Sequence, residues 1–169
     1  MTKAIIPAAG YGTRMLPITK AIPKEMLPIG RHPVIHHVVK EAVDAGITEI
    51  LVVISRGKEA ILNYFDRDPE LEAQLERKGK FKELEELCEI SSMATIHSVR
   101  QHEMKGLGDA VLHGRSFIGD DSFALLLGDT IIESSPHLLS RMARATVDHD
   151  QSCVAIEPVA RERASRYGV

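Results

Sequence analysis

A glycine-rich bend followed by closely spaced cations lies near the start of the chain. The stretch AAGYGTR begins at Ala8, and the TKAIPKEMLP segment behind it carries Lys20 and Lys24. Gly10 and Gly12 have no Cβ, so the backbone there can bend sharply and come close to a ligand. Successive backbone N–H groups in such a bend can form a concave anion-binding site. The arrangement therefore predicts a cradle for phosphate groups.

The side chains around the bend suit the same chemistry. Arg14 offers a planar guanidinium that matches phosphate oxygens, whereas the lysines are mobile point charges. Pro17, Pro23 and Pro28 stiffen the segment and limit how far its cations can move. Position 15 is Met15 rather than glycine, and no G-x-x-x-x-G-K-[ST] occurs, so the dinucleotide-binding fingerprint and the Walker loop are both absent. A plain surface turn stays open as the alternative.

The elements that must position these residues follow an α/β pattern. Short apolar or β-branched runs predict strands at residues 3–8, 49–55, 94–99, 122–129 and 152–159. Helical patterns predict helices at residues 33–47, 57–65, 108–118 and 136–149, and a charged helical segment over 66–90 with a break at Gly79. Their alternation predicts an α/β fold with a Rossmann-like, mostly parallel sheet flanked by helices. Ligands of such sheets bind beyond the carboxyl ends of the strands, where the glycine bend would lie.

Composition and charge argue against several classes of protein. The 169 residues fit one compact domain or part of a larger one, and a formal net charge of −3 without a large basic block disfavours nucleic acid as a partner. No apolar stretch approaches the roughly 18 residues that a membrane span needs. Cys88 and Cys153 are too few and too scattered for a disulfide framework or a thiolate metal site. We therefore expect a cytoplasmic protein with no nucleic-acid or membrane partner.

Two conspicuous features have structural explanations. His36 and His37 are adjacent, so on a helix their side chains point about 100° apart and cannot easily share one metal ion. We expect a packed or solvated pair. The segment 66–89 alternates its charges at helical spacing, which is typical of a solvent-exposed helix face. A contact between subunits is the alternative for that segment.

The stretch AAGYGTRMLPITKAIPKEMLPI resembles the G-x-G-T-R-(M/L)-x-P-x-T…K…L-P signature of the sugar-phosphate nucleotidylyltransferases. Within that family, TRMLPITKAIPKEMLP is most similar to the bacterial enzymes that join UTP to glucose 1-phosphate. The resemblance continues to the last residues, IEPVARERASRYGV. Members of the family run to somewhat under twice this length. The resemblance therefore implies that residues 1–169 are the nucleotide-binding part, with the sugar-binding and C-terminal part absent.

The resemblance implies a reaction in which glucose 1-phosphate attacks the α-phosphorus of UTP, giving UDP-glucose and pyrophosphate. Such a transfer requires mainly positioning and charge neutralisation, and no protein nucleophile. It also implies Mg²⁺ as cofactor and a homo-oligomer in the full-length form. Two alternatives stay open: a thymidylyltransferase that uses dTTP, and a non-catalytic nucleotide-binding or assembly module. A short form of the enzyme would bind UTP with little turnover.

The same resemblance assigns roles around the bend. Arg14 matches the residue on the β- and γ-phosphates, and Lys24 matches the cation near the α-phosphate, so these two are the expected catalytic residues. Lys20 is expected to be an outer charge. Glu25 is either a base or ribose contact or a simple ion-pair partner. The expected nucleotide-binding backbone comprises Ala8, Ala9, Gly10, Gly12 and Thr13, of which Ala9 and Gly10 match the backbone that meets the uracil ring.

Further along the chain, the resemblance implies five more site residues. Gln101 matches a glutamine that reads the base, Gly108 a backbone contact to the same ring, and Gly106 a turn ahead of the next helix. A carboxamide offers one acceptor and one donor, which complement uracil N3–H and a neighbouring carbonyl; thymine has the same edge, and a flipped amide would suit cytosine. Asp129 matches a metal-binding aspartate, which suits Mg²⁺, and Gly168 a glucose contact.

Overall fold

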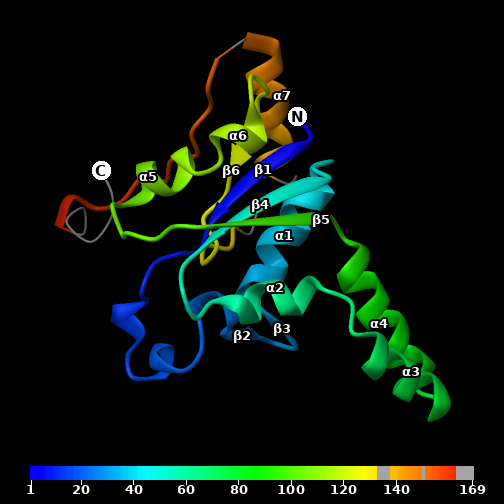
Figure 1. The fold of residues 1–169 in the computed structure, drawn as a ribbon. Coiled ribbons are helices and arrows are strands. Elements are labelled where there is room, and N and C mark those ends of the chain that lie inside the picture. Colours follow the sequence, from blue (N-terminus) through cyan, green and yellow to red (C-terminus); the bar gives the residue numbers. More distant parts are fainter. Residues whose placement is uncertain (133–137, 150, 163–169) are drawn as a thin grey trace.

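The core of the protein is a parallel four-stranded sheet (Figure 1). The computed structural model describes residues 1–132, 138–149 and 151–162. The strands lie in the order β5-β4-β1-β6, and every neighbouring pair is parallel. Their bounds are Lys3–Pro7 for β1, Glu49–Ile54 for β4, Thr95–Arg100 for β5 and Phe123–Leu125 for β6. This confirms the expected mostly parallel sheet flanked by helices.

The two faces of the sheet carry separate apolar clusters, because side chains alternate along a strand. Ala4 and Ile6 of β1 belong to the larger cluster, which includes Ile35 of α1 (Val34–Asp44) and Leu139 of α7 (Leu138–His149). Ile5 points to the opposite face, toward α5 (Leu107–Leu112) and α6 (Arg115–Ile118). β1 and β4 are buried on both faces, which explains why they read as continuous apolar runs, whereas the edge strand β5 is largely exposed.

The chain order of the strands creates a switch point beside β1. The chain runs from β1 outward to β4 and β5, then returns to place β6 on the other side of β1. The strand order thus reverses at β1, and in open α/β sheets ligands bind at such a reversal, beyond the carboxyl ends of the strands. Between β1 and α1 the chain forms three short 3₁₀ helices and a small hairpin: η1 (Thr13–Met15), η2 (Ile18–Lys20), η3 (Lys24–Met26), β2 (Pro28–Ile29) and β3 (His32–Pro33).

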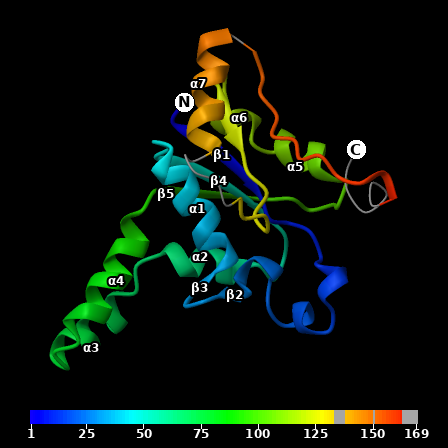
Figure 2. The ribbon, with the colours of Figure 1, turned by 180° about the vertical axis from the view of Figure 1, so that it is seen from behind.

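The charged segment forms two helices that extend away from the sheet (Figures 1 and 2). They are α3 (Pro69–Arg77) and α4 (Phe81–Ser92), which follow α2 (Glu59–Phe65). Gly79 separates them at a φ of +67°, so the expected break is confirmed. Asp68 caps α3, since its Oδ1 accepts the Leu71 N–H at 3.0 Å. None of the helices in the described ranges is long and apolar enough to cross a membrane.

Three predicted elements differ from the structure. The expected strand 152–159 is wrong: over those residues the chain forms no strand, and Val154 and Ile156 are 78% and 91% exposed. A strand requires a neighbour to take its hydrogen bonds, and none of the described segments pairs with it. The helix 108–118 is broken into α5 and α6 at Gly114. The strand 122–129 is shorter, ending at Leu125, because β6 pairs with only three residues of β1.

Gly114, between α5 and α6, lies so close to the sheet that a side chain there would overlap with it. A Cβ at this position would lie 2.4 Å from Ile5 Cδ1 and 3.2 Å from Leu51 Cδ2. Gly114→Ala is therefore expected to lower the free energy of unfolding by about 1–3 kcal/mol through overpacking. Urea unfolding measures this. Gly108→Ala is the matched control, since its Cβ meets nothing within 4 Å and alanine favours a helix; equal midpoints for the two variants would contradict the prediction.

His32 and His36, around the start of α1, pack against each other and against Tyr64 of α2. His36 and His32 stack with ring centroids 4.1 Å apart, and Tyr64 Oη lies 3.1 Å from His36 Nδ1 and 3.2 Å from His32 Nδ1. No cluster of three His, Cys, Asp or Glu able to hold a metal occurs in the described part of the chain. Burial, with the neighbouring charges of His32, His37 and Lys40, lowers the pKa of His36 from 6.5 to about 4. Burial likewise raises the pKa of Tyr64 to about 12.

Because the pKa of His36 is lower in the folded protein, the unfolded chain takes up a proton first as the pH falls. The free energy of unfolding should therefore decrease between pH 6.5 and about 4, by at most about 3 kcal/mol. His36→Gln removes that titration and should flatten the acid limb of a plot of unfolding free energy against pH. His102→Gln, at an exposed position, is the control. An acid limb of unchanged slope in His36→Gln would refute this.

Candidate nucleotide-binding site

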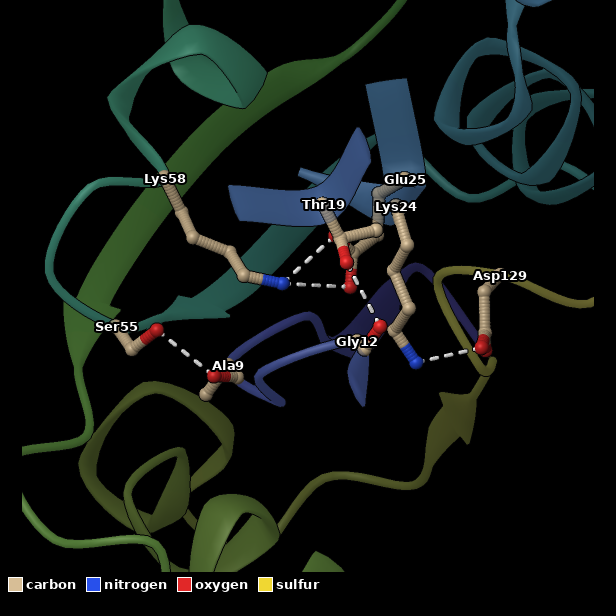
Figure 3. Close-up of polar contacts among 8 residues, drawn as sticks. All are labelled: Ala9, Gly12, Thr19, Lys24, Glu25, Ser55, Lys58 and Asp129. Atoms are coloured by element: carbon tan, nitrogen blue, oxygen red, sulfur yellow. Dashed lines mark hydrogen bonds and ion pairs between the residues drawn. The ribbon is translucent and has the colours of Figure 1, made fainter. Parts of the chain in front are cut away.

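The glycine bend lies immediately beyond the carboxyl end of β1. The Ser55 hydroxyl donates to Ala9 O at 2.7 Å (Figure 3). The Ala8 N–H donates to Val53 O at 2.8 Å, so both alanines are tied to the end of β4. Gly10 is exposed, with nothing within 4 Å of where a Cβ would be. Two buried residues thus anchor the bend while the next presents open backbone. This is the geometry that close approach of a ligand requires.

Gly12 turns the bend into η1. Its φ of +67° lies in the left-handed region, which side-chain-bearing residues rarely adopt. The Thr19 hydroxyl donates to Gly12 O at 2.9 Å and ties η2 back to the bend. Thr13 and Arg14 follow in η1 with exposed side chains. The structure gives Arg14 no ion pair within the described residues, so its guanidinium extends from this loop into solvent.

Lys24 and Asp129 meet across the switch point. Lys24 Nζ donates to Asp129 Oδ2 at 2.6 Å, although the residues are 105 positions apart (Figure 3). Lys24 comes from the loop after β1 and Asp129 from the loop after β6, and their side chains are 24% and 39% exposed. One cation and one carboxylate therefore lie together at the place where such sheets bind ligands. Lys20, by contrast, is exposed in η2.

Glu25, next to Lys24, is an ion-pair partner. Its side chain is 1% exposed, and both carboxylate oxygens accept from Lys58 Nζ, at 2.9 and 2.7 Å. Of the two roles expected for Glu25, a base or ribose contact and an ion pair, the structure shows the ion pair. Burial lowers the pKa of Lys58, and the carboxylate of Glu25 opposes that shift. The pair joins η3 to the residue that precedes α2, and so fixes the backbone from which Lys24 projects.

Gln101 lies one residue past β5, at the same edge of the sheet. Its backbone N–H donates to Ile54 O at 2.8 Å, and the residue is 3% exposed. Its side-chain Nε2 donates to Asp109 Oδ2 at 2.7 Å and to Gly106 O at 3.4 Å. Gly106 has a φ of +96°, which allows the tight turn into α5, and Gly108 is exposed in the first turn of that helix.

The structure thus brings most of the expected residues to one edge of the sheet, around the ends of β1, β4, β5 and β6. Gly168 lies outside the described residues. The sequence interpretation missed three residues: Ser55, Lys58 and Asp109. Ser55 ends a predicted buried strand and Lys58 comes three residues later. This position could have marked them, because the loops after parallel strands line the ligand edge. Asp109 had no comparable signal, since acidic residues are common in first helical turns.

Comparison with known proteins agrees with this geometry. The family described as nucleotidyl transferase matches residues 3–169. The chain belongs to the nucleotidyl transferase family. The family assignment made from the sequence is therefore confirmed.

This nucleotidyl transferase is similar to the UTP–glucose-1-phosphate uridylyltransferase of Bacillus subtilis, with 48% identity over 99% of the chain and 57% of that protein. It is also similar to a solved apo UDP-glucose pyrophosphorylase, with 43% identity, a TM-score of 0.89, and coverage of 100% of this chain and 63% of that one. A UTP-bound enzyme from Acinetobacter baumannii shows 44% identity and a TM-score of 0.85, covering 89% and 54%. The chain spans less than two thirds of the length of these relatives.

Proposed function

We propose that the protein carrying this chain transfers the uridylyl group of UTP to glucose 1-phosphate, giving UDP-glucose and pyrophosphate. The observation that carries the proposal is the meeting of Lys24 and Asp129 at the switch point, 2.6 Å apart, beside the glycine bend. The names of the similar proteins supply the substrates. We further propose that residues 1–169 form the nucleotide-binding part of the enzyme.

The proposed mechanism requires positioning and charge neutralisation rather than a protein nucleophile. The glycine bend holds the base and the triphosphate, with the exposed backbone of Gly10 toward the nucleotide. Arg14 binds the β- and γ-phosphates, which leave as pyrophosphate. Lys24 neutralises charge on the α-phosphate while an oxygen of the sugar phosphate attacks it. Each cation then stabilises charge that moves during the transfer.

Asp129 is the residue that would hold Mg²⁺. Its carboxylate is partly exposed at the sheet edge, and Lys24 contacts only Oδ2. Magnesium prefers oxygen ligands and usually takes one or two carboxylates together with substrate phosphates and waters. A single aspartate therefore fits an ion that arrives with the nucleotide. Bound there, Mg²⁺ would neutralise part of the triphosphate charge. Asp129 would then coordinate Mg²⁺ instead of pairing with Lys24.

Calorimetric titration of the chain with UTP–Mg²⁺, dTTP–Mg²⁺ and ATP–Mg²⁺ tests the binding part of this proposal. Pyrophosphate release with and without glucose 1-phosphate tests the reaction. We expect UTP to bind more tightly than ATP, and release that depends on the sugar phosphate in the natural protein that carries the chain. Binding without release would favour a non-catalytic module, preferred turnover of dTTP would favour a thymidylyltransferase, and no nucleotide binding would refute the assignment.

A further inference from the structure

The carboxamide of Gln101 is held on its nitrogen side by two acceptors. Asp109 Oδ2 lies 2.7 Å from Nε2, and Gly106 O lies 3.4 Å from it. An ionised carboxylate and a backbone carbonyl can only accept hydrogen bonds. Turning the amide over would therefore place Oε1 against two oxygens and lose both bonds. The surroundings of Gln101 thus fix which end of the amide faces the protein.

The other end of the amide stays available. Among the residues that the structure describes, Oε1 of Gln101 receives no hydrogen bond, yet no side-chain nitrogen or oxygen is sealed from solvent without a partner. Oε1 therefore keeps access to solvent although the residue is 3% exposed as a whole. It lies at the end of β5, on the edge that also carries the glycine bend. A base that reaches this edge would meet an acceptor.

We propose that Asp109 is a specificity-determining positioning residue that makes Gln101 an acceptor toward the base. This inference rests on the proposed function, in which Gln101 reads the nucleobase. Uracil and thymine carry a donor at N3, which an acceptor oxygen would bind, whereas N3 of cytosine is itself an acceptor and would be repelled. A freely turning amide could serve either base. Asp109, rather than Gln101 alone, therefore decides between uridine and cytidine nucleotides.

The test is the ratio of the dissociation constants of CTP–Mg²⁺ and UTP–Mg²⁺, measured by calorimetry on the chain. The ratio should be high for the unmodified chain and should fall about tenfold in Asp109→Ala, within the range that one hydrogen-bonded base contact supplies. Asp109→Lys replaces the acceptor by a donor, favours the turned amide and should lower the ratio further. The affinities for UTP and dTTP should change in parallel, because both bases present the same edge.

Two more variants separate positioning from a structural effect. Asp109→Asn keeps the size of the side chain but can support either orientation of the amide, so its ratio should lie between those of the unmodified chain and Asp109→Ala. Asp120→Asn removes an exposed carboxylate after α6 and should leave the ratio unchanged. Circular dichroism establishes that each variant is folded. If Asp109→Ala does not fold, the Asp109→Asn ratio decides.

The outcomes distinguish this inference from the proposed function. A chain that binds neither nucleotide overturns the proposed function, and the present inference with it. A chain that binds UTP but keeps the same CTP-to-UTP ratio in Asp109→Ala and Asp109→Asn overturns the role of Asp109 alone. Equal affinity of the unmodified chain for UTP and CTP also overturns that role and leaves nucleotide binding intact. A ratio that falls from the unmodified chain through Asp109→Asn and Asp109→Ala to Asp109→Lys supports the role of Asp109.

Discussion

Replacing Lys24 by methionine is expected to reduce sugar-dependent pyrophosphate release from UTP about 10²–10³-fold, the typical cost of removing one group that stabilises transition-state charge. The ammonium group lies at the switch point, held by Asp129 at 2.6 Å. Methionine keeps most of the length and the apolar stem of lysine, so the fold should stay intact. The measurement is kcat and KM for UTP in the natural protein, with the melting temperature as a check on folding.

Lys20→Met is the matched control for that variant. Lys20 belongs to the same cationic segment but is exposed in η2, so its loss should leave kcat within the same order of magnitude. A fall in kcat with little change in KM would mean that Lys24 acts mainly in the transition state. Equal rates for Lys24→Met and the unmodified protein would remove Lys24 from the catalytic residues and leave the ion pair with Asp129 as a structural contact.

Breaking the buried pair between Glu25 and Lys58 should have the largest effect on stability. Glu25→Gln leaves the Lys58 ammonium, 8% exposed, without its counter-charge. Removal of one partner of a buried ion pair typically costs about 3–5 kcal/mol, because the remaining charge is uncompensated. Urea unfolding of Glu25→Gln should show a loss of this size. Turnover should fall as well, since Glu25 holds the segment that carries Lys24.

The double variant Glu25→Gln, Lys58→Met tests the cause. With both charges gone, most of the lost stability should return, because a buried pair replaced by uncharged groups is often neutral. The exposed pair of Arg100 and Glu59, with side chains 43% and 50% exposed, supplies the control: Glu59→Gln should cost less than about 1 kcal/mol. If Glu25→Gln costs no more than Glu59→Gln, the buried pair contributes little.

Local sequence patterns predicted much of the fold correctly. The apolar run at residues 3–8, the stripe of α1 and the break at Gly79 were all legible, because strand and helix periods and helix-breaking residues act over a few positions. The strand predicted at 152–159 is absent for the opposite reason: an apolar run is a property of one segment, whereas a strand forms only beside a pairing partner. The helix predicted over 108–118 is interrupted at Gly114, which lies close to Ile5 and Leu51 of the sheet. These neighbours are distant in the sequence, so no local pattern indicates them.

The sequence by itself determined the α/β order of elements and the position of the glycine bend and its cations after the first strand, since these depend on residues close together in the chain. Only the tertiary structure decided which groups meet. Lys24 contacts Asp129, which is 105 positions away in the sequence, and Glu25 contacts Lys58, which is 33 positions away. Asp109 accepts a hydrogen bond from the side-chain amide of Gln101. Such pairings follow from strand order, which places the loops after β1, β4, β5 and β6 at one edge, and no short pattern encodes that order.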